Sequence, residues 1–264
     1  MTGRLLGFEQ AESLLRHGAA PLVIGHRGAS DLAPENTLAA FQAAWSADVE
    51  WIETDVQPTA DLVPVLFHDD TLDRISSVVG QLRARRLSEV ANLDAGSWFS
   101  RLRGAVDFSA LRIPTMHEFL SALPATGRVL LEIKGPHTDD ELVIELAVIR
   151  ATRTMDRVWL QSFEIDVLAQ LAVYIPNCWL GLLRDDVDAD PVALCRELGL
   201  SSYHPEYTAL LARPEIVAEL HAAGISVITF TANDDADWER LTALGVDGII
   251  TDRPASLLEW QRRR

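Results

Sequence analysis

Two histidines each follow a short apolar run in the sequence: His26 comes after Pro21–Gly25, and His68 comes after Val63–Phe67. Imidazole exchanges protons near neutral pH, so two of them can serve as base and acid in the cleavage of a phosphodiester. His204 ends another apolar run, and the sequence leaves open whether it faces the same site. Four further histidines lie in expected helices or loops and receive no role: His17, His117, His137 and His221. His26 and His68 are therefore the candidates for proton transfer.

Three carboxylates fall within the apolar runs and could hold a metal ion. Glu53 and Asp55 are two positions apart on one expected strand, so their side chains project from the same face. Glu132 comes from a separate strand. Oxygen ligands without a thiolate suit Mg²⁺, Ca²⁺ or Mn²⁺ rather than zinc. The structural alternative is that these carboxylates form ion pairs with Arg27 and Lys134.

Those two cations are the natural partners of a phosphate group, because Arg27 offers a planar fork of donors and Lys134 a compact charge. Gln161 ends a further expected strand and is a third candidate for substrate binding.

The chain as a whole is acidic, with 23 Lys and Arg against 39 Asp and Glu and a net charge of −16. This balance argues against a nucleic-acid or anionic-membrane partner. The residues thus point to metal-assisted phosphoester chemistry on a small molecule.

Nine short, β-rich runs would position these groups, and their continuous hydrophobicity is typical of parallel strands buried on both faces. The expected strands are 21–25, 51–57, 63–67, 128–134, 157–161, 178–183, 200–204, 225–230 and 247–250. Helical patterns lie between them, near 35–47, 115–123, 139–151, 164–173, 190–198, 213–223, 234–244 and 254–262. If 51–57 and 63–67 belong to one unit, the count is close to eight strand–helix pairs. The sequence therefore predicts an α/β fold of the (β/α)₈ TIM-barrel kind, with the candidate residues at its mouth.

No Pro/Ser linker or charge block divides the chain, so we expect one domain over residues 1–264. Residues 70–112 interrupt the strand–helix rhythm and are expected to be a small insertion after the second barrel strand. This segment carries Arg83, Arg85 and Arg86. The sequence leaves open whether it walls the active site or forms a solvated loop.

Other features predict a soluble, cytoplasmic protein without a membrane anchor. The longest uncharged stretch, Val167–Leu183, is just short of spanning length. It is interrupted by Gln170, Pro176 and Asn177. Glu9 and Glu12 near the start are unlike a signal peptide. Two cysteines, Cys178 and Cys195, are too few for a disulfide framework and are expected to be buried apolar side chains. Nothing in the sequence predicts the oligomeric state.

At this point the ordered motifs become recognisable as those of a known family. They are His26-Arg27-Gly28, Pro34-Glu35-Asn36-Thr37, Glu53-Thr54-Asp55-Val56, His68-Asp69, Leu131-Glu132-Ile133-Lys134, Gln161-Ser162-Phe163 and the closing Gly245–Asp252 segment. In this order they resemble the glycerophosphodiester phosphodiesterase family, over roughly residues 21 to 258. Each short motif alone is weak evidence for a family, but the whole set in this order is specific for this one.

The resemblance implies a barrel of the phospholipase C-like phosphodiesterase type and hydrolysis of glycerophosphodiesters to sn-glycerol 3-phosphate and an alcohol. It implies that His26 and His68 are the acid–base pair and that the glycerol 2-hydroxyl attacks phosphorus to give a cyclic phosphate. We assign the deprotonation of that hydroxyl to His26 and the protonation of the leaving alcohol to His68, and the reverse assignment stays open. The resemblance further implies that the metal ligands are Glu53, Asp55 and Glu132, that the phosphate ligands are Arg27 and Lys134, and that Glu35 supports the metal site. Two alternatives stay open: a lipid-cleaving phosphodiesterase of lysophospholipase D type, and a catalytically silent barrel that binds phosphodiesters.

The sequence departs from the family pattern at three places. The usual Thr-x-Asp-Gly turn ends in Leu62, Arg-Thr-Thr after the second histidine is replaced by a segment beginning at Arg74, and Trp-Thr-x-Asn begins with Phe230. Phe230 keeps an aromatic face for the glycerol backbone, though a smaller one than tryptophan. These departures affect substrate preference more than the presumed catalytic groups.

Overall fold

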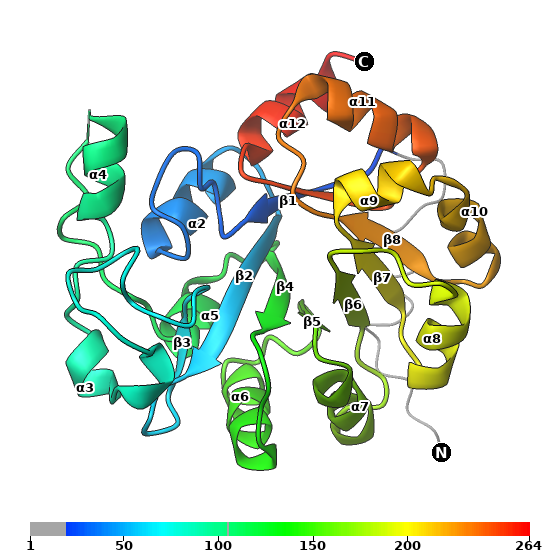
Figure 1. Ribbon diagram of the computed structural model, residues 1–264. Coiled ribbons are helices and arrows are strands. Elements are labelled where there is room, and N and C mark those ends of the chain that lie inside the picture. The colour runs from blue at the N-terminus through cyan, green and yellow to red at the C-terminus, as the bar shows by residue number, and fades with distance from the viewer. Residues whose placement is uncertain (1–19, 105) are drawn as a thin grey trace.

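Within residues 20–104 and 106–264, which the computed structural model describes, nine strands form one sheet, in agreement with the nine apolar runs (Figure 1). The strands are β1 (Leu22–His26), β2 (Trp51–Pro58), β3 (Pro64–Leu66), β4 (Arg128–Ile133), β5 (Val158–Ser162), β6 (Leu180–Arg184), β7 (Ser202–Pro205), β8 (Ser226–Thr229) and β9 (Gly248–Thr251). Eight run parallel in the order β1-β9-β8-β7-β6-β5-β4-β2, and a β1–β2 pairing closes the ring. β3 is the extra strand, antiparallel to β2, so the runs 51–57 and 63–67 do form one unit. The predicted eight-stranded barrel is confirmed.

Helices cover the outside of this barrel (Figure 1). They are α2 (Leu38–Ser46), α5 (Met116–Ala122), α6 (Asp139–Ala151), α7 (Ile165–Tyr174), α8 (Pro191–Leu198), α10 (Glu215–Ala222), α11 (Asp235–Leu244) and α12 (Pro254–Arg262). Each of the eight matches a predicted helical segment, and α7 ends one residue beyond the predicted 164–173. Outside the insertion near 70–112, α9 (Tyr207–Ala212) was not predicted; the side chain of Glu206 caps it. No helix in the described ranges is long and apolar enough to cross a membrane, and Val167–Leu183 divides between α7 and β6.

Period-two alternation along the strands separates an apolar floor from a polar layer inside the barrel. A buried cluster fills the floor: Ile24, Trp51, Leu130, Trp159, Trp179, Ile228 and Ile250. The residue two positions beyond Ile24 is His26, and the residue two beyond Trp51 is Glu53. In the same way, Leu130 leads to Glu132 and Trp159 leads to Gln161. Because residues two apart on a strand share a face, the candidate groups point into the barrel like the apolar floor beneath them.

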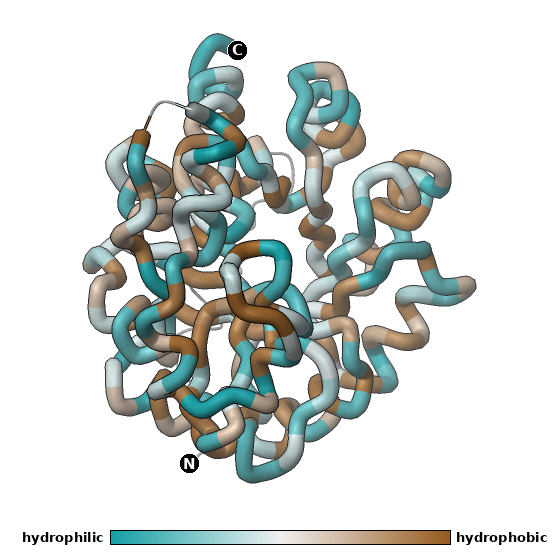
Figure 2. The backbone as a smooth tube through the Cα atoms, turned by 60° about the vertical axis from the view of Figure 1, so that its left-hand side comes forward, coloured by the Kyte–Doolittle hydropathy of each residue, from teal (hydrophilic) through white to brown (hydrophobic). Residues whose placement is uncertain are grey.

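A second, larger apolar cluster joins the outer faces of the strands to the helices. Figure 2 shows the chain alternating between hydrophobic and hydrophilic stretches, as this layered packing requires. Of the two cysteines, Cys195 is buried in this cluster and Cys178 packs against it, and neither forms a disulfide. The predicted role as apolar filler is thus confirmed for Cys195 and partly for Cys178. The expectations for Glu9, Glu12 and His17 lie outside the described residues.

The helix expected from residue 35 begins three residues later because of the turn that precedes it. Thr37 caps α2 by accepting a hydrogen bond from the Ala40 N–H, and Asn36 adopts a left-handed φ of 55°. Arg27 also has a left-handed φ, of 54°, and Gly28 follows at 92°. A Cβ at Gly28 would lie 2.6 Å from the Ala40 carbonyl carbon, so the chain must have glycine there. This turn places the motif around Glu35 beside the end of β1.

The insertion after β2 is a packed structure rather than a solvated loop. It contains η1 (Leu82–Ala84), α3 (Leu87–Val90) and α4 (Ser97–Arg103), none of which the sequence predicted. A small apolar core holds it together: Val65, Phe67, Leu72, Ile75, Leu82, Val90, Ala95 and Ile113. In Figure 1 it stands next to α2 and β3 at one side of the barrel. Its Arg103 lines a cavity that also contains His26 and Arg27, and its Arg74 contacts Glu35.

Leu62 occupies the position where the family turn has glycine, and it has a left-handed φ of 61°. This conformation costs an L-residue about 1–2 kcal/mol, more than the entropy that glycine loses on folding, about 0.5–1 kcal/mol. Leu62 is 39% exposed, so little packing is lost by truncation. We expect Leu62→Gly to raise Tm by about 1–3 °C in calorimetry. Leu62→Ala removes the side chain but retains the strain and should not raise Tm; an equal gain in both variants would contradict this explanation.

Candidate active site

A cavity of about 420 Å³ lies at the carboxyl ends of the barrel strands and brings most of the predicted residues together. Eight of the ten candidates line it: His26, Arg27, Glu53, His68, Glu132, Lys134, Gln161 and Phe230. Asp55 is buried beside them, and Glu35 lines an adjoining cavity. Strand register explains the gathering, because Asp55 pairs with Glu132 across β2 and β4, and Glu132 with Gln161 across β4 and β5.

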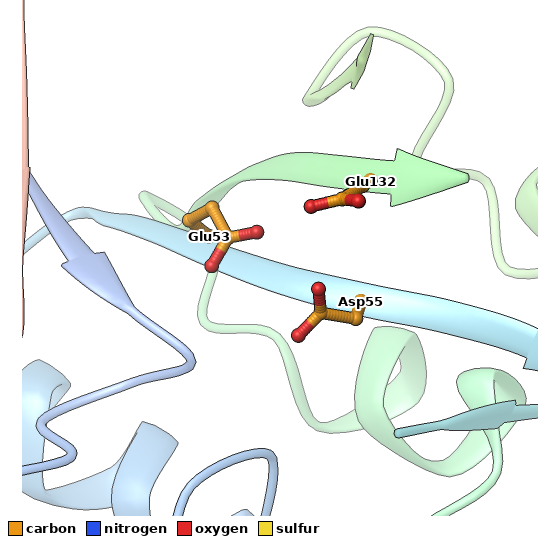
Figure 3. Close-up of side chains that lie close together, drawn as sticks. All are labelled: Glu53, Asp55 and Glu132. Atoms are coloured by element: carbon orange, nitrogen blue, oxygen red, sulfur yellow. The ribbon is translucent and has the colours of Figure 1, made fainter. Parts of the chain in front are cut away.

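The three predicted metal ligands converge inside the barrel (Figure 3). Each of Glu53, Asp55 and Glu132 offers an oxygen, and these oxygens lie within 4.8 Å of one another. All three residues are buried. Burial and the neighbouring carboxylates raise the pKa of Glu53 well above its usual range and that of Glu132 to about 8. Burial of three acidic groups side by side thus favours the protonated forms of Glu53 and Glu132 until a cation compensates their charge.

Arg27 and Lys134 face this acidic cluster, as the ion-pair alternative predicts. The Arg27 Nε lies 3.3 Å from Asp55, and the Lys134 ammonium lies 2.8 Å from Glu132 and 3.6 Å from Asp55. Although burial opposes it, these two cations hold the pKa of Asp55 well below its usual value. Asn36 adds an amide donor 2.8 Å from the same carboxylate, and Thr54 holds Asn36 in turn. Asp55 is therefore the ionised centre of the cluster.

The donor set fits a divalent cation. Arg27 and Lys134 form ion pairs with Asp55 and Glu132, whereas the described contacts of Glu53 are N–H donors from the Arg27 backbone and the Gln161 amide. A bound cation would therefore compensate the charge that ion pairing does not cover. All ligands are hard oxygens, and neither cysteine takes part. The residues thus fit Mg²⁺, Ca²⁺ or Mn²⁺ while keeping the ion pairs, and the two interpretations of the sequence are compatible.

His26 forms a dyad with the last carboxylate of the Gly245–Asp252 motif, to which no role was assigned from the sequence. Its Nδ1 lies 2.6 Å from Asp252, which follows β9. Asp252 also accepts hydrogen bonds from Ser30 and Asn233. Although burial alone would raise it, these contacts lower the pKa of Asp252 to about 2. The carboxylate is thereby fixed in its ionised form and oriented to stabilise a protonated His26.

His68 forms a different dyad, whose carboxylate is shared with a guanidinium. Its Nδ1 lies 2.7 Å from Asp69, and Arg74 binds the same carboxylate at 2.6 and 3.0 Å. Burial lowers the pKa of His68, against the influence of Asp55. The Gln57 amide donates to the backbone carbonyls of residues 67, 68 and 69, which fixes the segment that carries the imidazole. The two histidines therefore have unequal partners.

Glu35 joins the His68 side to the carboxylate cluster through two guanidiniums. Arg74 donates to both oxygens of Glu35 at 2.7 Å, and Arg27 donates to one of them at 2.7 Å. Glu35 is not among the carboxylates gathered for a metal. Its observed contacts support Arg27 rather than extend the acidic cluster.

This geometry predicts the effect of Arg74→Lys. A lysine cannot bridge Asp69 and Glu35 with the same planar fork, so both lose a positioning contact. We expect kcat for phosphodiester cleavage to fall about 10-fold with an unchanged fold. Arg85→Lys, in the same insertion but away from the cavity, is the matched control. Equal kcat values for the two variants in a steady-state assay would contradict a positioning role for Arg74.

The remaining walls of the site differ in polarity. Phe163, Leu183, Phe230 and Ile250 form an apolar side of the first cavity, with the two phenylalanine rings edge to face at 5.9 Å. A second cavity of about 380 Å³ shares His26 and Arg27 with the first. Its other lining residues are all polar or charged: Ser30, Asp31, Glu35, Arg103, Asn233, Asp252 and Arg253. His26 and Arg27 thus stand between an apolar-walled cavity and a polar one.

His204, whose position the sequence left open, does not line either cavity. It is fully buried within the barrel and contacts Gln161, which does line the first cavity. Several residues that hold the site in place were not predicted, namely Asn36, Gln57, Asp69 and Asn233. Three of them, Asn36, Asp69 and Asn233, stand inside motifs of the sequence and could have been found there.

Comparison with known proteins agrees with this arrangement. Residues 26–256 match the Glycerophosphoryl diester phosphodiesterase family. A glycerophosphodiester phosphodiesterase of Caldanaerobacter subterraneus is 33% identical over 248 residues, which cover 92% of this chain and 98% of the relative. An Oleispira antarctica phosphodiesterase solved with the product sn-glycerol-3-phosphate has a TM-score of 0.86 at 28% identity, covering 96% of this chain and 99% of the other. The Agrobacterium tumefaciens glycerophosphodiester phosphodiesterase has a TM-score of 0.77 at 28% identity, covering 90% and 99%. The chain therefore belongs to the glycerophosphoryl diester phosphodiesterase family.

Proposed function

We propose that this protein hydrolyses glycerophosphodiesters to sn-glycerol 3-phosphate and an alcohol. The main support for the proposal is that one cavity contains two imidazoles, two buried carboxylates and two cationic side chains. Family membership supplies the substrate class, and the product complex of the Oleispira relative is consistent with it. His26 and His68 are the acid–base pair in this proposal.

The cofactor in this proposal is a divalent cation, Mg²⁺ or Ca²⁺, with Mn²⁺ as a third candidate. Glu53, Asp55 and Glu132 would hold it. When bound, the cation supplies positive charge next to the non-bridging oxygens of the phosphate. Arg27 and Lys134 bind the same phosphate from the protein side, with Arg27 held in place by Glu35.

Proton transfer in the first step follows from the two dyads. His26, with Asp252 behind it, accepts the proton of the glycerol 2-hydroxyl as that oxygen attacks phosphorus. His68 donates its proton to the leaving alcohol oxygen as the P–O bond breaks, which gives a cyclic phosphate. In the second step the histidines exchange roles: His68 deprotonates the water that attacks phosphorus, and His26 returns a proton to the 2-oxygen as the bond between that oxygen and phosphorus breaks. The attacking hydroxyl belongs to the substrate itself and is already close to phosphorus. In ideal intramolecular reactions this lowers the activation barrier by about 7–11 kcal/mol, because no second molecule has to be brought into place.

The first cavity, which both histidines line, provides for the glycerol and for the leaving oxygen of the substrate. The glycerol carbons pack against Phe230 there, Gln161 contributes an amide, and the leaving alcohol oxygen lies within reach of His68. The adjoining cavity shares His26 and Arg27, and its charged lining suits a water-soluble group rather than an acyl chain. These assignments favour a deacylated glycerophosphodiester over a lysophospholipid.

We further propose that residues 1–264 act as a single domain with the insertion near 70–112, in the cytoplasm, on diesters produced by lipid turnover. The family match over most of the chain supports the single domain. Two free thiols suit a reducing compartment. The net charge of −16 supports a small-molecule partner rather than a nucleic acid.

The test compares glycerophosphocholine with lysophosphatidylcholine as substrates and follows phosphorus by NMR. The proposal predicts sn-glycerol 3-phosphate from the first substrate, with a cyclic glycerol phosphate accumulating transiently or under single-turnover conditions. Cleavage of only the lysophospholipid would favour the lipid-cleaving alternative. Tight binding of the diester without turnover would favour a silent binding barrel.

A further inference from the structure

A buried row of polar side chains runs from Gln161 through the barrel interior away from the cavity, and the proposed reaction uses none of its members beyond Gln161. Gln161 begins the row, with its Nε2 3.3 Å from Glu53 and its Oε1 2.7 Å from the Nδ1 of His204. The Nε2 of His204 lies 2.8 Å from the Ser202 hydroxyl, which accepts a hydrogen bond from the Trp179 indole at 3.1 Å. All five residues are buried, and His204 and Ser202 have no exposed surface.

With the Gln161 amide oriented as observed, the shortest contacts of this row place each proton; the Leu180 carbonyl, 3.5 Å from the Ser202 hydroxyl, is a weaker acceptor than the His204 Nε2 at 2.8 Å. The amide oxygen of Gln161 can only accept, so the Nδ1 of His204 must donate. Burial lowers the pKa of His204 to about 3, so the ring is neutral and its Nε2 must accept. The Ser202 hydroxyl therefore donates to Nε2, while its oxygen accepts from the indole. Trp179 and Ser202 thus select the His204 tautomer that donates to Gln161.

The tautomer decides which way the Gln161 amide faces. In the observed orientation its NH₂ group donates to the Glu53 carboxylate. The opposite orientation would place an amide oxygen against the Glu53 oxygen and an NH₂ group against the Nδ1–H of His204. With Glu53 ionised, as cation binding requires, both contacts would be repulsive in a buried setting, where unpaired polar groups cost about 1–3 kcal/mol each. His204 therefore holds the amide in the orientation that Glu53 requires.

The neighbouring strand is shaped to admit this ring. Gly181 lies between Gln161 and Ser202 in the strand register. A Cβ at Gly181 would lie 2.3 Å from the His204 Cε1 and 2.8 Å from the Ser202 Oγ. No other residue fits without displacing the imidazole, so β6 gives independent support for the placement of His204.

We propose that His204 is a positioning residue, which fixes the Gln161 amide and through it the Glu53 carboxylate for cation binding. His204 does not touch the substrate, because the Gln161 side chain lies between it and the cavity. Among the described residues, the Gln161 amide nitrogen has no second hydrogen-bond partner. Its remaining N–H is thereby available to a phosphate oxygen in the cavity that Gln161 lines.

The test measures Mn²⁺ affinity by calorimetry, because this readout does not depend on turnover. His204→Leu removes the donor, whereas His204→Asn places an amide nitrogen close to the position of Nδ1 and retains it. We expect His204→Leu to weaken Mn²⁺ binding about 10-fold and His204→Asn to stay within about 2-fold of the parent. In a Gln161→Leu background, His204→Leu should have no further effect on affinity, because the contact that transmits it is gone.

The outcomes separate this inference from the proposed function on which it rests. If the parent protein binds Mn²⁺ but His204→Leu binds it equally well, His204 is a core residue only and the inference is wrong. If both His204 variants weaken binding alike, donation from Nδ1 is not the cause. If His204→Leu does not fold, Ser202→Ala provides the test: it removes the donor to Nε2, and unchanged Mn²⁺ affinity in this variant would overturn the inference. Failure of the parent to bind any divalent cation or cleave any diester would instead count against the proposed function.

Discussion

His68→Ala is expected to lower kcat for glycerophosphocholine by a factor of about 10²–10⁴, and a p-nitrophenol leaving group should restore much of that loss. The leaving alcohol of the natural substrate needs a proton, whereas p-nitrophenolate leaves without one. His68 has the surroundings of a proton donor, because burial and nearby cations favour release of its proton. Burial, together with Arg27 and Lys134, lowers its pKa, and Arg74 shares the Asp69 carboxylate that contacts its ring. The measurement compares glycerophosphocholine with its p-nitrophenyl analogue for each variant.

His26→Ala should lose as much activity with glycerophosphocholine but should not be rescued by the better leaving group. Its role is to take the proton of the attacking hydroxyl, which the leaving group does not affect. His117→Ala, on the exposed face of α5, is the control and should retain full activity. Rescue of His26→Ala instead of His68→Ala would reverse the two roles. Retention of activity by either cavity variant would contradict the acid–base pair.

Glu53→Gln is expected to abolish cation-dependent activity while making the cation-free protein more stable. The carboxylate lies among Asp55 and Glu132, and burial with these neighbours disfavours its ionised form. Replacing it with a neutral side chain of the same shape relieves that repulsion but removes one of three oxygen ligands. We expect kcat to fall by at least about 10²-fold and Mn²⁺ affinity to fall about 10- to 100-fold.

Differential scanning calorimetry in chelator measures the stability side of this prediction. Glu53→Gln should raise Tm by a few degrees, on the order of 2–4 °C for each kcal/mol gained. Glu50→Gln, a neighbouring exposed carboxylate, should change neither Tm nor activity appreciably. A lower Tm for Glu53→Gln in chelator would show that its contacts with the Arg27 backbone and Gln161 outweigh the repulsion. Unchanged cation affinity would remove Glu53 from the ligand set.

Much of the fold could be predicted because each barrel strand carries its own signal. A continuous apolar run bounded by polar residues marks both the strand and the point where it reaches the mouth, as in the segment that ends at Glu132 and Lys134. Glycines after helices, such as Gly199 and Gly245, adopt the left-handed φ expected at a helix end. These signals are local, so a single sequence is sufficient to find them.

The short helices of the insertion could not be predicted for the opposite reason. α3 spans only Leu87–Val90, too short to show a helical period, and its stability comes from packing of Val90 in the insertion core. α9 depends on a cap from Glu206, a residue less typical of that position than serine or aspartate. Tertiary contacts, rather than local propensity, decide both.

The site shows the same division between local and long-range information. The residue types and strand positions of Glu53, Asp55 and Glu132 were sufficient to predict their convergence. The partner of His26 was not predictable, because Asp252 lies 226 residues away and only closure of the barrel between β1 and β9 brings them together. Likewise, His204 ends its strand like a residue of the mouth, but its ring turns into the space left by Gly181. Pairings of this kind depend on the completed barrel.

The central claim is that this barrel performs cation-dependent hydrolysis of glycerophosphodiesters with its own paired histidines and acidic cluster. Its most direct test is release of sn-glycerol 3-phosphate from glycerophosphocholine by protein stripped with chelator and then supplied with Mg²⁺, Ca²⁺ or Mn²⁺. We expect no release before addition, release after addition of at least one cation, and none from Glu53→Gln under the same conditions. Undiminished release in chelator, or no release with any cation, would contradict the account.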